Sequence, residues 1–383
     1  MREASKQPLL FQPLKLGSLT LKNRIVVAPM CQYKSVDGMP VDWHYAHLGR
    51  YAIGGAGVVF YEETAVEARG RKSYECAGLY DDSQLPSFQR IASLIKSLGS
   101  VPAMQLGHSG RKASVKSAMH DWAPLGPDDA ARGKPPWVGV SPSPLPAAPG
   151  KHIPKEMDAD DMRIVIDAFK EATRRTADAG FEILEIHGAH GYLLHQFLSP
   201  LSNLRTDSYG GDLEGRMRFV LEVTEAVRDA WPKDLPLFFR VSSVDGKGGV
   251  WNMDDTVELA KAVKERGVDV VDCSAGGITG DSSMPAVAPG PGNQVAFASR
   301  VRAEADVKSL AVGYITEPDQ AETVLQEGHA DLIGIARELM YHADWPIHAA
   351  KALGVPDHLD LFPPSYAHRL VRREEQLSPR QEK

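Results

Sequence analysis

The chain has 383 residues, of which 43% are hydrophobic and 24% are charged, a composition typical of a globular protein with a large buried core. The formal net charge of -7 argues against nucleic acid or an anionic membrane surface as a partner, because both attract basic surfaces. A local basic site for a small anion is compatible with this balance.

Short apolar segments recur along the chain, and each is followed by a longer amphipathic one. Near-continuous hydrophobicity is typical of strands that are buried on both faces, as in parallel sheets. In chain order, we expect strands at residues 24–28, 57–61, 101–105, 183–187, 237–241, 268–272, 310–313 and 331–335.

Segments with helical spacing separate these strands. The clearest run from Asp158 to Ala179, Leu213 to Ala230, Asp254 to Arg266 and Pro318 to Glu327. Several are followed directly by glycine, which is common just after the end of a helix. Eight strands that alternate with helices predict the α/β class and a single (β/α)8 TIM barrel. A doubly wound sheet is the alternative, but no Gly-x-Gly-x-x-Gly turn follows the first strand.

Residues 107–157 depart from this alternation. They are rich in proline and have no helical period. An interdomain linker has this composition, but three predicted strands precede the segment and five follow it, so neither part closes a barrel alone. We therefore interpret residues 1–383 as one barrel domain, in which 107–157 form a lid over the barrel mouth and about 355–383 form a C-terminal tail.

The densest polar cluster follows the fourth predicted strand, at the end where TIM barrels carry their chemistry. It consists of His187, His190 and Tyr192. The two imidazoles could bind a metal with His195 as a third ligand, or cap the next helix. They could also direct two N–H donors at one substrate oxygen while the phenol donates a proton. We favour the last use and expect no metal, because small residues separate the histidines and a tyrosine stands where zinc chemistry needs a glutamate.

Three longer strings carry a specific pattern. They are Ala28-Pro29-Met30-Cys31-Gln32-Tyr33, residues 105–113, and residues 187–216 with their His187-x-x-His190-x-Tyr192 start. Together they resemble the Old Yellow Enzyme family of FMN-dependent ene-reductases, and the Cys31 and Tyr33 pair resembles its thermophilic-like subgroup. The resemblance extends from about Leu10 to Pro346. It implies bound FMN, hydride from NADPH or NADH, and reduction of activated C=C bonds in α,β-unsaturated carbonyls, nitroalkenes and maleimides.

The resemblance also implies a cofactor site. Arg240 would offset the negative charge of reduced flavin, and the turns after the seventh and eighth strands would bind the phosphate. Cys31 would lie beside the flavin and tune its potential. The residues that we expect to contact FMN are Ala28, Pro29, Met30, Cys31, Glu63, Gln105, Arg240, Gly313, Ala336 and Arg337.

The same resemblance implies a substrate site. His187 and His190, both neutral, would bind the carbonyl or nitro oxygen of the substrate. Tyr192 would donate the proton to the α-carbon while the flavin delivers hydride to the β-carbon. Tyr33 would close the other side of the pocket.

This chain departs from its relatives at three places. Glu63 stands where many relatives carry a small residue, usually alanine, and a carboxylate there would weaken the binding of anionic reduced flavin unless it turns away. Ala336 replaces the more usual glycine before Arg337. Near the C-terminus, where relatives of the subgroup send an arginine into a neighbouring subunit, Arg369 is displaced by one position and His368 holds the matching place. We expect a homodimer or homotetramer.

Two other functions remain open. Residues 42–49 and 54–57 resemble flavin barrels that act on aromatic or enoyl-CoA thioesters, as reductases or monooxygenases. A flavin-binding protein without turnover is the second, but it needs no proton donor such as Tyr192.

No membrane segment or signal peptide is expected, because no apolar run approaches ~20 residues and the N-terminus is polar. The three cysteines, Cys31, Cys76 and Cys273, form no Cys-x-x-Cys pair. An odd number of such cysteines suits a reducing compartment, so we expect a cytoplasmic protein.

Overall fold

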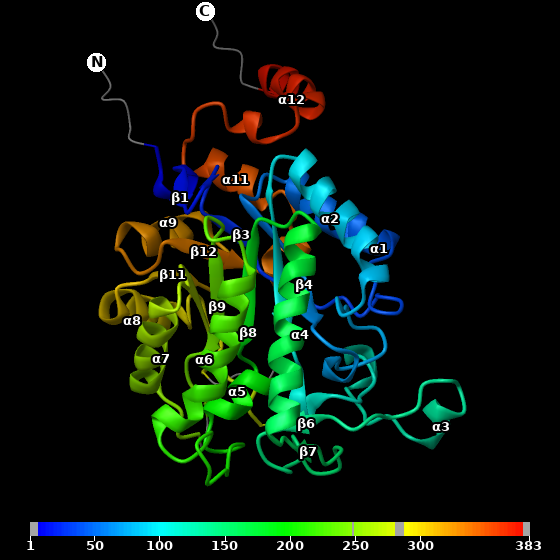
Figure 1. The fold of residues 1–383 in the computed structure, drawn as a ribbon. Coiled ribbons are helices and arrows are strands. Elements are labelled where there is room, and N and C mark those ends of the chain that lie inside the picture. The colour runs from blue at the N-terminus through cyan, green and yellow to red at the C-terminus, as the bar shows by residue number, and fades with distance from the viewer. Residues whose placement is uncertain (1–6, 247–248, 280–286, 378–383) are drawn as a thin grey trace, which may run out of the picture.

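The computed structural model describes residues 7–246, 249–279 and 287–377 (Figure 1). Eight parallel strands close into a barrel in the order β3-β4-β5-β8-β9-β10-β11-β12. This confirms the TIM barrel and makes the doubly wound sheet wrong. The strands are β3 (Ile25–Val27), β4 (Val58–Ala65), β5 (Val101–Gly107), β8 (Ile183–Gly188), β9 (Leu237–Ser242), β10 (Val270–Ser274), β11 (Lys308–Ala311) and β12 (Leu332–Ile335).

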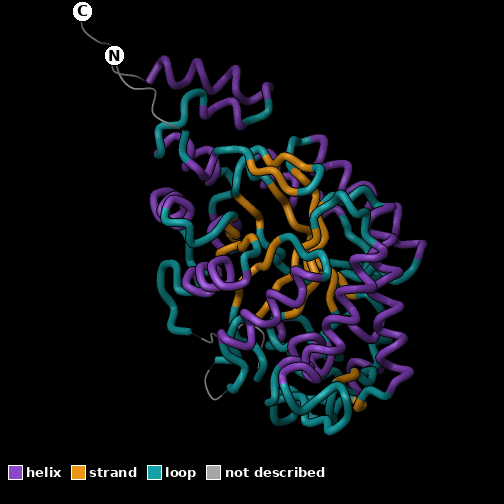
Figure 2. Tube along the Cα trace, turned by 60° about the vertical axis from the view of Figure 1, so that its left-hand side comes forward, coloured by secondary structure: helices purple, strands orange, loops and turns teal. Residues whose placement is uncertain are grey.

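Helices surround the strands, as Figure 2 shows. The carboxylates of Asp158 and Asp212 accept backbone N–H groups in the first turns of α4 and α6, which fixes where these helices begin. The helices are α1 (Asp42–Ile53), α2 (Leu85–Ser97), α4 (Ala159–Asp178), α5 (Leu193–Leu198), α6 (Leu213–Ala230), α7 (Met253–Glu265), α8 (Val295–Ala305), α9 (Pro318–Gln326), α10 (Arg337–Tyr341), α11 (Trp345–Ala352) and α12 (Pro364–Leu377).

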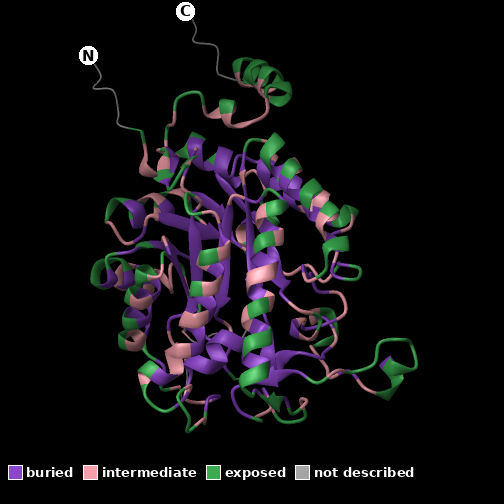
Figure 3. Cartoon of the chain, in the orientation of Figure 1, coloured by how far each residue is buried: buried purple, intermediate pink, exposed green. Residues whose placement is uncertain are grey.

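Alternate residues of each strand face the barrel interior and the helices. Two buried apolar clusters result, one inside the barrel and one between the barrel and its helices (Figure 3). The hairpin of β1 (Leu14–Leu16) and β2 (Leu19–Leu21) contributes Leu16 and Leu21 to the inner cluster. The inner cluster therefore fills the barrel and leaves the C-terminal ends of the strands for other side chains.

The segment between β5 and α4 leaves one barrel strand and returns to the same barrel. It contains α3 (Pro127–Ala130) and the short paired strands β6 (Val140–Ser141) and β7 (Lys155–Glu156). In Figure 1, β6 and β7 lie at the end of the molecule opposite β1. The backbone N–H of Leu204 donates to Ser143 Oγ at 2.9 Å, which ties the segment to the loop after α5.

The C-terminal segment lies at the other end of the barrel, above α11 in Figure 1. None of the described residues of α12 is buried. His368 and Arg369 are exposed there, far from the C-terminal ends of the strands in this chain. Among the described helices, none is both long enough and apolar enough to cross a membrane.

Candidate active site

A layer of polar side chains lies on top of the apolar barrel core. Strand alternation points four of them inward, because each stands two positions after an apolar residue of the inner cluster: Gln105, Glu185, Arg240 and Asp272. Strand register places these residues side by side, because Gln105 pairs with both Glu63 and Glu185, and Arg240 pairs with His187 and Asp272. Residues from five strands therefore meet at the barrel mouth.

Two acidic residues in this layer, Glu185 and Asp272, were missed by the sequence analysis. Gln105 Nε2 donates to Glu185 Oε1 at 2.8 Å, and Arg240 Nε lies 3.3 Å from Asp272 Oδ2. Burial and the neighbouring Asp272 raise the pKa of Glu185 well above its usual value, and burial also raises the pKa of Asp272 although Arg240 opposes this. The pair can therefore retain a proton beside Arg240. Each stands two positions after an inward-facing apolar residue, Ile183 or Val270, and this alternation could have predicted that both carboxylates face the barrel interior.

His187, His190 and Tyr192 meet at the end of β8, as the sequence predicts. The His187 ring centroid lies 5.0 Å from those of His190 and Tyr192, and the interplanar angles are 66° and 79°. His190 adopts a positive φ of 59°, and its backbone N–H donates to Ser242 Oγ at 2.9 Å. The turn is thus held in a conformation that places both imidazoles on one side of it.

The two imidazoles are neutral. Burial lowers the pKa of His187 and of His190 well below the usual value, and nearby cationic groups, Arg240 among them, lower it further. His190 Nε2 lies 2.8 Å from Ser274 Oγ. His187 Nδ1 is buried and has no hydrogen-bond partner among the described residues. A buried polar atom without a hydrogen bond reduces the stability of the fold, so this nitrogen is available to hydrogen-bond a ligand.

His195, the possible third metal ligand, uses both of its ring nitrogens in hydrogen bonds within the protein. Its Nε2 lies 2.9 Å from Asp245 Oδ1, and its Nδ1 accepts the backbone N–H of Gly191 at 2.9 Å. Both ring nitrogens are therefore occupied, and His195 anchors the turn that carries Tyr192. The geometry does not favour a zinc site made of the three histidines.

A pocket of about 350 Å³ opens at the ends of β3, β11 and β12. Gly313 has a φ of 109°, and a Cβ there would lie 2.6 Å from Asn293 Oδ1. The Arg337 guanidinium lies 4.4 Å from the Tyr314 ring centroid. Five residues expected to contact FMN line this pocket together with Ser274 and Gln294: Ala28, Arg240, Gly313, Ala336 and Arg337.

This pocket fits FMN. Gln294 Oε1 is buried there and has no hydrogen-bond partner among the described residues, and Arg240 Nε has an ion-pair contact with Asp272 but no hydrogen bond. Cationic Arg337 and the glycine turn at Gly313 suit a phosphate, while Arg240 suits the charged edge of the flavin ring. The remaining residues expected to contact FMN do not line this pocket: Pro29, Met30, Cys31, Glu63 and Gln105.

Cys31 and Glu63 instead meet Lys72, which the sequence analysis did not single out. Lys72 Nζ lies 2.5 Å from Glu63 Oε2 and 3.1 Å from Cys31 Sγ. Burial raises the pKa of the Cys31 thiol, so it stays protonated. Glu63 does not turn away from the site; its charge is offset by a buried ammonium.

Tyr33 lies on the same side of the site. Its hydroxyl accepts the Trp122 indole N–H at 3.2 Å, and Lys72 Nζ lies 6.0 Å from its ring centroid. Trp122 belongs to the segment between β5 and α4, so that segment reaches the predicted substrate site.

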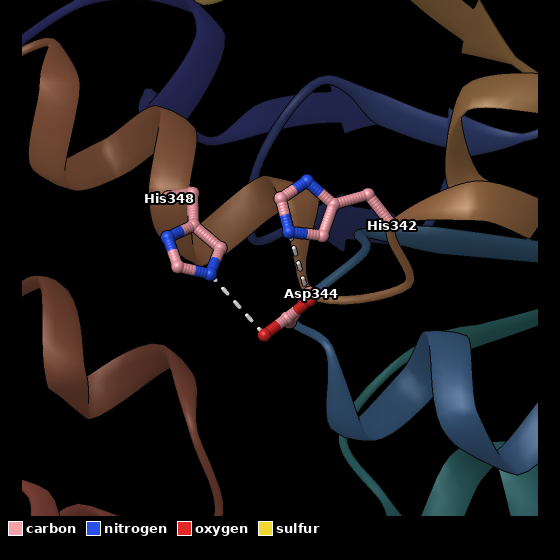
Figure 4. Close-up of side chains that lie close together, drawn as sticks. All are labelled: His342, Asp344 and His348. Atoms are coloured by element: carbon pink, nitrogen blue, oxygen red, sulfur yellow. Dashed lines mark hydrogen bonds and ion pairs between the residues drawn. The ribbon is translucent and has the colours of Figure 1, made fainter.

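A separate cluster of possible metal ligands lies at the opposite end of the barrel. The ligand atoms of His342, Asp344 and His348 all lie within 4.8 Å of one another (Figure 4). The His-x-Asp-x-x-x-His spacing could have identified it. The carbonyl of the intervening Ala343 packs against Gly54, which precedes β4. The cluster is therefore remote from His187 and contributes nothing to the site described above.

Comparisons with known proteins agree with this geometry. The model of the NADH:flavin oxidoreductase / NADH oxidase family matches residues 9–355. An NADPH dehydrogenase of Geobacillus sp. (strain WCH70) is 41% identical over 351 residues, which are 91% of this chain and 95% of the relative.

Solved structures share the fold. A 2-naphthoyl-CoA reductase matches 91% of this chain with a TM-score of 0.78 and 25% identity. The match covers 53% of that protein, so this chain spans about half of its length. Morphinone reductase has a TM-score of 0.75 and 24% identity over 91% of both chains. The chain therefore belongs to the NADH:flavin oxidoreductase / NADH oxidase family, and it is an FMN-dependent NAD(P)H oxidoreductase of the Old Yellow Enzyme type.

Proposed function

We propose that His187, His190 and Tyr192 carry the reduction of the activated double bond. The observation that carries this proposal is the buried, unpaired Nδ1 of His187, which lies in one cluster with His190 and Tyr192. Neutral imidazoles can donate N–H groups to a carbonyl or nitro oxygen and stabilise the charge that develops on it. The phenol of Tyr192 donates the proton to the α-carbon.

FMN occupies the pocket between β3, β11 and β12 in this proposal. When bound, FMN supplies hydride exchange between the nicotinamide and the double bond. Ala28, Pro29 and Met30, together with Gln105 and Arg240, hold its ring. Gly313, Ala336 and Arg337 hold its phosphate, which the lining of the pocket supports.

Other features of the chain extend the proposal. Residues 107–157 act as a lid, which is supported by the Trp122 contact with Tyr33.

The chain forms a homodimer or homotetramer in which His368 or Arg369 reaches a neighbouring site; their exposure on α12 supports this. The enzyme works in the cytoplasm, in keeping with three free thiols.

An anaerobic screen tests the proposed substrate class. Purified protein with FMN and NADPH is offered cyclohexenone, a maleimide, a nitroalkene and an enoyl-CoA. We expect turnover of the first three, and loss of turnover of cyclohexenone in Tyr192→Phe. The fold shared with a 2-naphthoyl-CoA reductase makes CoA thioesters the second candidate. Turnover of the thioester alone would assign the chain to that class instead.

A further inference from the structure

A buried ion pair lies beside the proposed proton donor. Glu63 is 4% exposed and Lys72 is 2% exposed, and Lys72 Nζ lies 2.5 Å from Glu63 Oε2. A pair of this kind contributes little net stability, because removing two charges from water offsets most of their attraction. Stability alone therefore does not explain the pair, and its position beside the proposed proton donor points to a role in the site.

Local backbone features place Glu63 in the site. The pairing of β4 with β5 shifts register between Tyr61 and Glu63, so β4 has an irregularity just before the carboxylate. Gly107 of β5 leaves the space that the side chain needs, since a Cβ there would lie 2.7 Å from Glu63 Oε1. That oxygen is buried and has no hydrogen-bond partner among the described residues.

Lys72 connects this carboxylate to the reacting groups. Its Nζ lies 4.8 Å from the Tyr192 ring centroid and donates to Cys31 Sγ at 3.1 Å. The pKa of Lys72 is raised above its usual value, because the acidic groups around it outweigh its burial. Lys72 is therefore an ammonium, and Glu63 holds it against Tyr192.

The other groups that face Tyr192 differ from Lys72 in charge or distance. His187 is 5.0 Å away between ring centroids and is neutral. Tyr33 stays protonated, because burial raises the pKa of its hydroxyl. Lys112 is a second cation among the described residues, at 5.9 Å from the Tyr192 ring centroid, and it donates to the backbone carbonyls of His190 and Gly277.

We propose that Lys72, held in place by Glu63, is a positioning residue that stabilises the phenolate left on Tyr192 after it donates its proton. An ammonium close to the ring favours the ionised phenol, and Tyr192 therefore releases its proton to carbon more readily. This inference rests on the proposed role of Tyr192 as the proton donor. It also explains how a carboxylate at position 63 is compatible with a site that binds an anionic cofactor.

The first test measures the ionisation of Tyr192 itself, without turnover. Ultraviolet difference titration compares the wild-type holoenzyme and Lys72→Met, each against its own Tyr192→Phe counterpart. We expect the Tyr192 phenol in Lys72→Met to ionise about 1 pH unit higher, because the nearby positive charge is lost. An unchanged or lower ionisation pH overturns the proposal.

A second variant distinguishes the loss of the Lys72 charge from an effect of misfolding. Lys72→Met leaves the Glu63 carboxylate buried without a partner, which costs stability. Glu63→Gln/Lys72→Met removes both charges and keeps the net charge and the side-chain volumes nearly the same. It should show a shift in the same direction. The exposed pair Lys96–Glu182, at 2.7 Å, provides the matched control, and Lys96→Met should leave the ionisation of Tyr192 unchanged.

A double-mutant cycle on cyclohexenone reduction separates the two proposals. Lys72→Met should slow this step by up to about tenfold in wild type, and by little in the Tyr192→Phe background, because both changes act on one proton. Lys72→Arg should restore part of the rate. If Tyr192→Phe slows the step but Lys72→Met slows it equally in both backgrounds, the role of Lys72 is refuted while that of Tyr192 stands. If Tyr192→Phe has no effect, the proposed proton donor itself is wrong.

Discussion

His187 and Arg240 are register partners on the neighbouring strands β8 and β9. A residue proposed to bind substrate and a residue proposed to hold the flavin ring thus lie side by side at the same level of the barrel. The positive charge of Arg240 also helps to keep His187 neutral. A change in one residue is therefore expected to affect the other, and the predictions below separate their effects by measuring different steps.

Removing either imidazole should slow alkene reduction far more than flavin reduction. His187→Ala and His190→Ala each remove a donor to the substrate oxygen, which typically costs ~3 kcal/mol, or roughly a hundredfold in rate. Reduction of the flavin by NADPH needs no polarised oxygen. Stopped-flow measurement of the two half-reactions distinguishes the steps, and equal damage to both would contradict the assignment.

The low pKa values of His187 and His190 predict a specific dependence on pH. Both imidazoles stay neutral in the folded protein as the pH falls below the usual histidine value of about 6.5, whereas the unfolded chain takes up protons there. Stability should therefore fall as the pH drops below about 6.5, while substrate affinity stays constant as the pH falls through that value. Denaturant unfolding and ligand titration across this range check both expectations. NMR signals of imidazolium from either residue at pH 6 would be incompatible with them.

The barrel could be predicted from sequence because its strands are buried on both faces. The helix limits were also close, since Asp158 and Asp212 mark the starts of α4 and α6. The end of β4 was not found. This strand continues to Ala65, past the predicted end at Tyr61, through the polar run Glu62-Glu63-Thr64, which is buried but has no apolar signal.

The candidate site was predictable only where its residues are close in sequence. His187, His190 and Tyr192 share one turn, so their spacing identified them. Lys72 was missed because its partner Glu63 meets it only through the fold of the loop after β4. Glu185 and Asp272 come from different strands, and only barrel closure shows that they share a layer.

The glycine turn at Gly313 should be required for FMN binding. In Gly313→Ala, the new methyl group would lie 2.6 Å from Asn293 Oδ1 at a φ of 109°, so the turn must shift away from the pocket. FMN affinity should fall at least about tenfold, as measured by fluorescence titration of the apoprotein. Gly180→Ala is the control, because its φ is also positive, at 84°, but nothing lies within 4 Å. It should cost about 1 kcal/mol of stability and leave FMN affinity unchanged. Equal FMN affinity in the two variants would exclude the turn from the cofactor site.

Tyr192→Phe should separate substrate binding from proton transfer. The ring is 5% exposed and packs edge-on against His187, so phenylalanine should preserve that packing and leave ligand affinity nearly intact. Cyclohexenone reduction should slow by one to about four powers of ten, depending on how far water replaces the phenol. Maleimide reduction should change least, because its enolate-like product can take a proton from solvent. Stopped-flow rates for both substrates, with binding measured on the oxidised enzyme, test this order. If maleimide and cyclohexenone slow by the same factor, Tyr192 acts on hydride transfer or on packing and not as the proton donor.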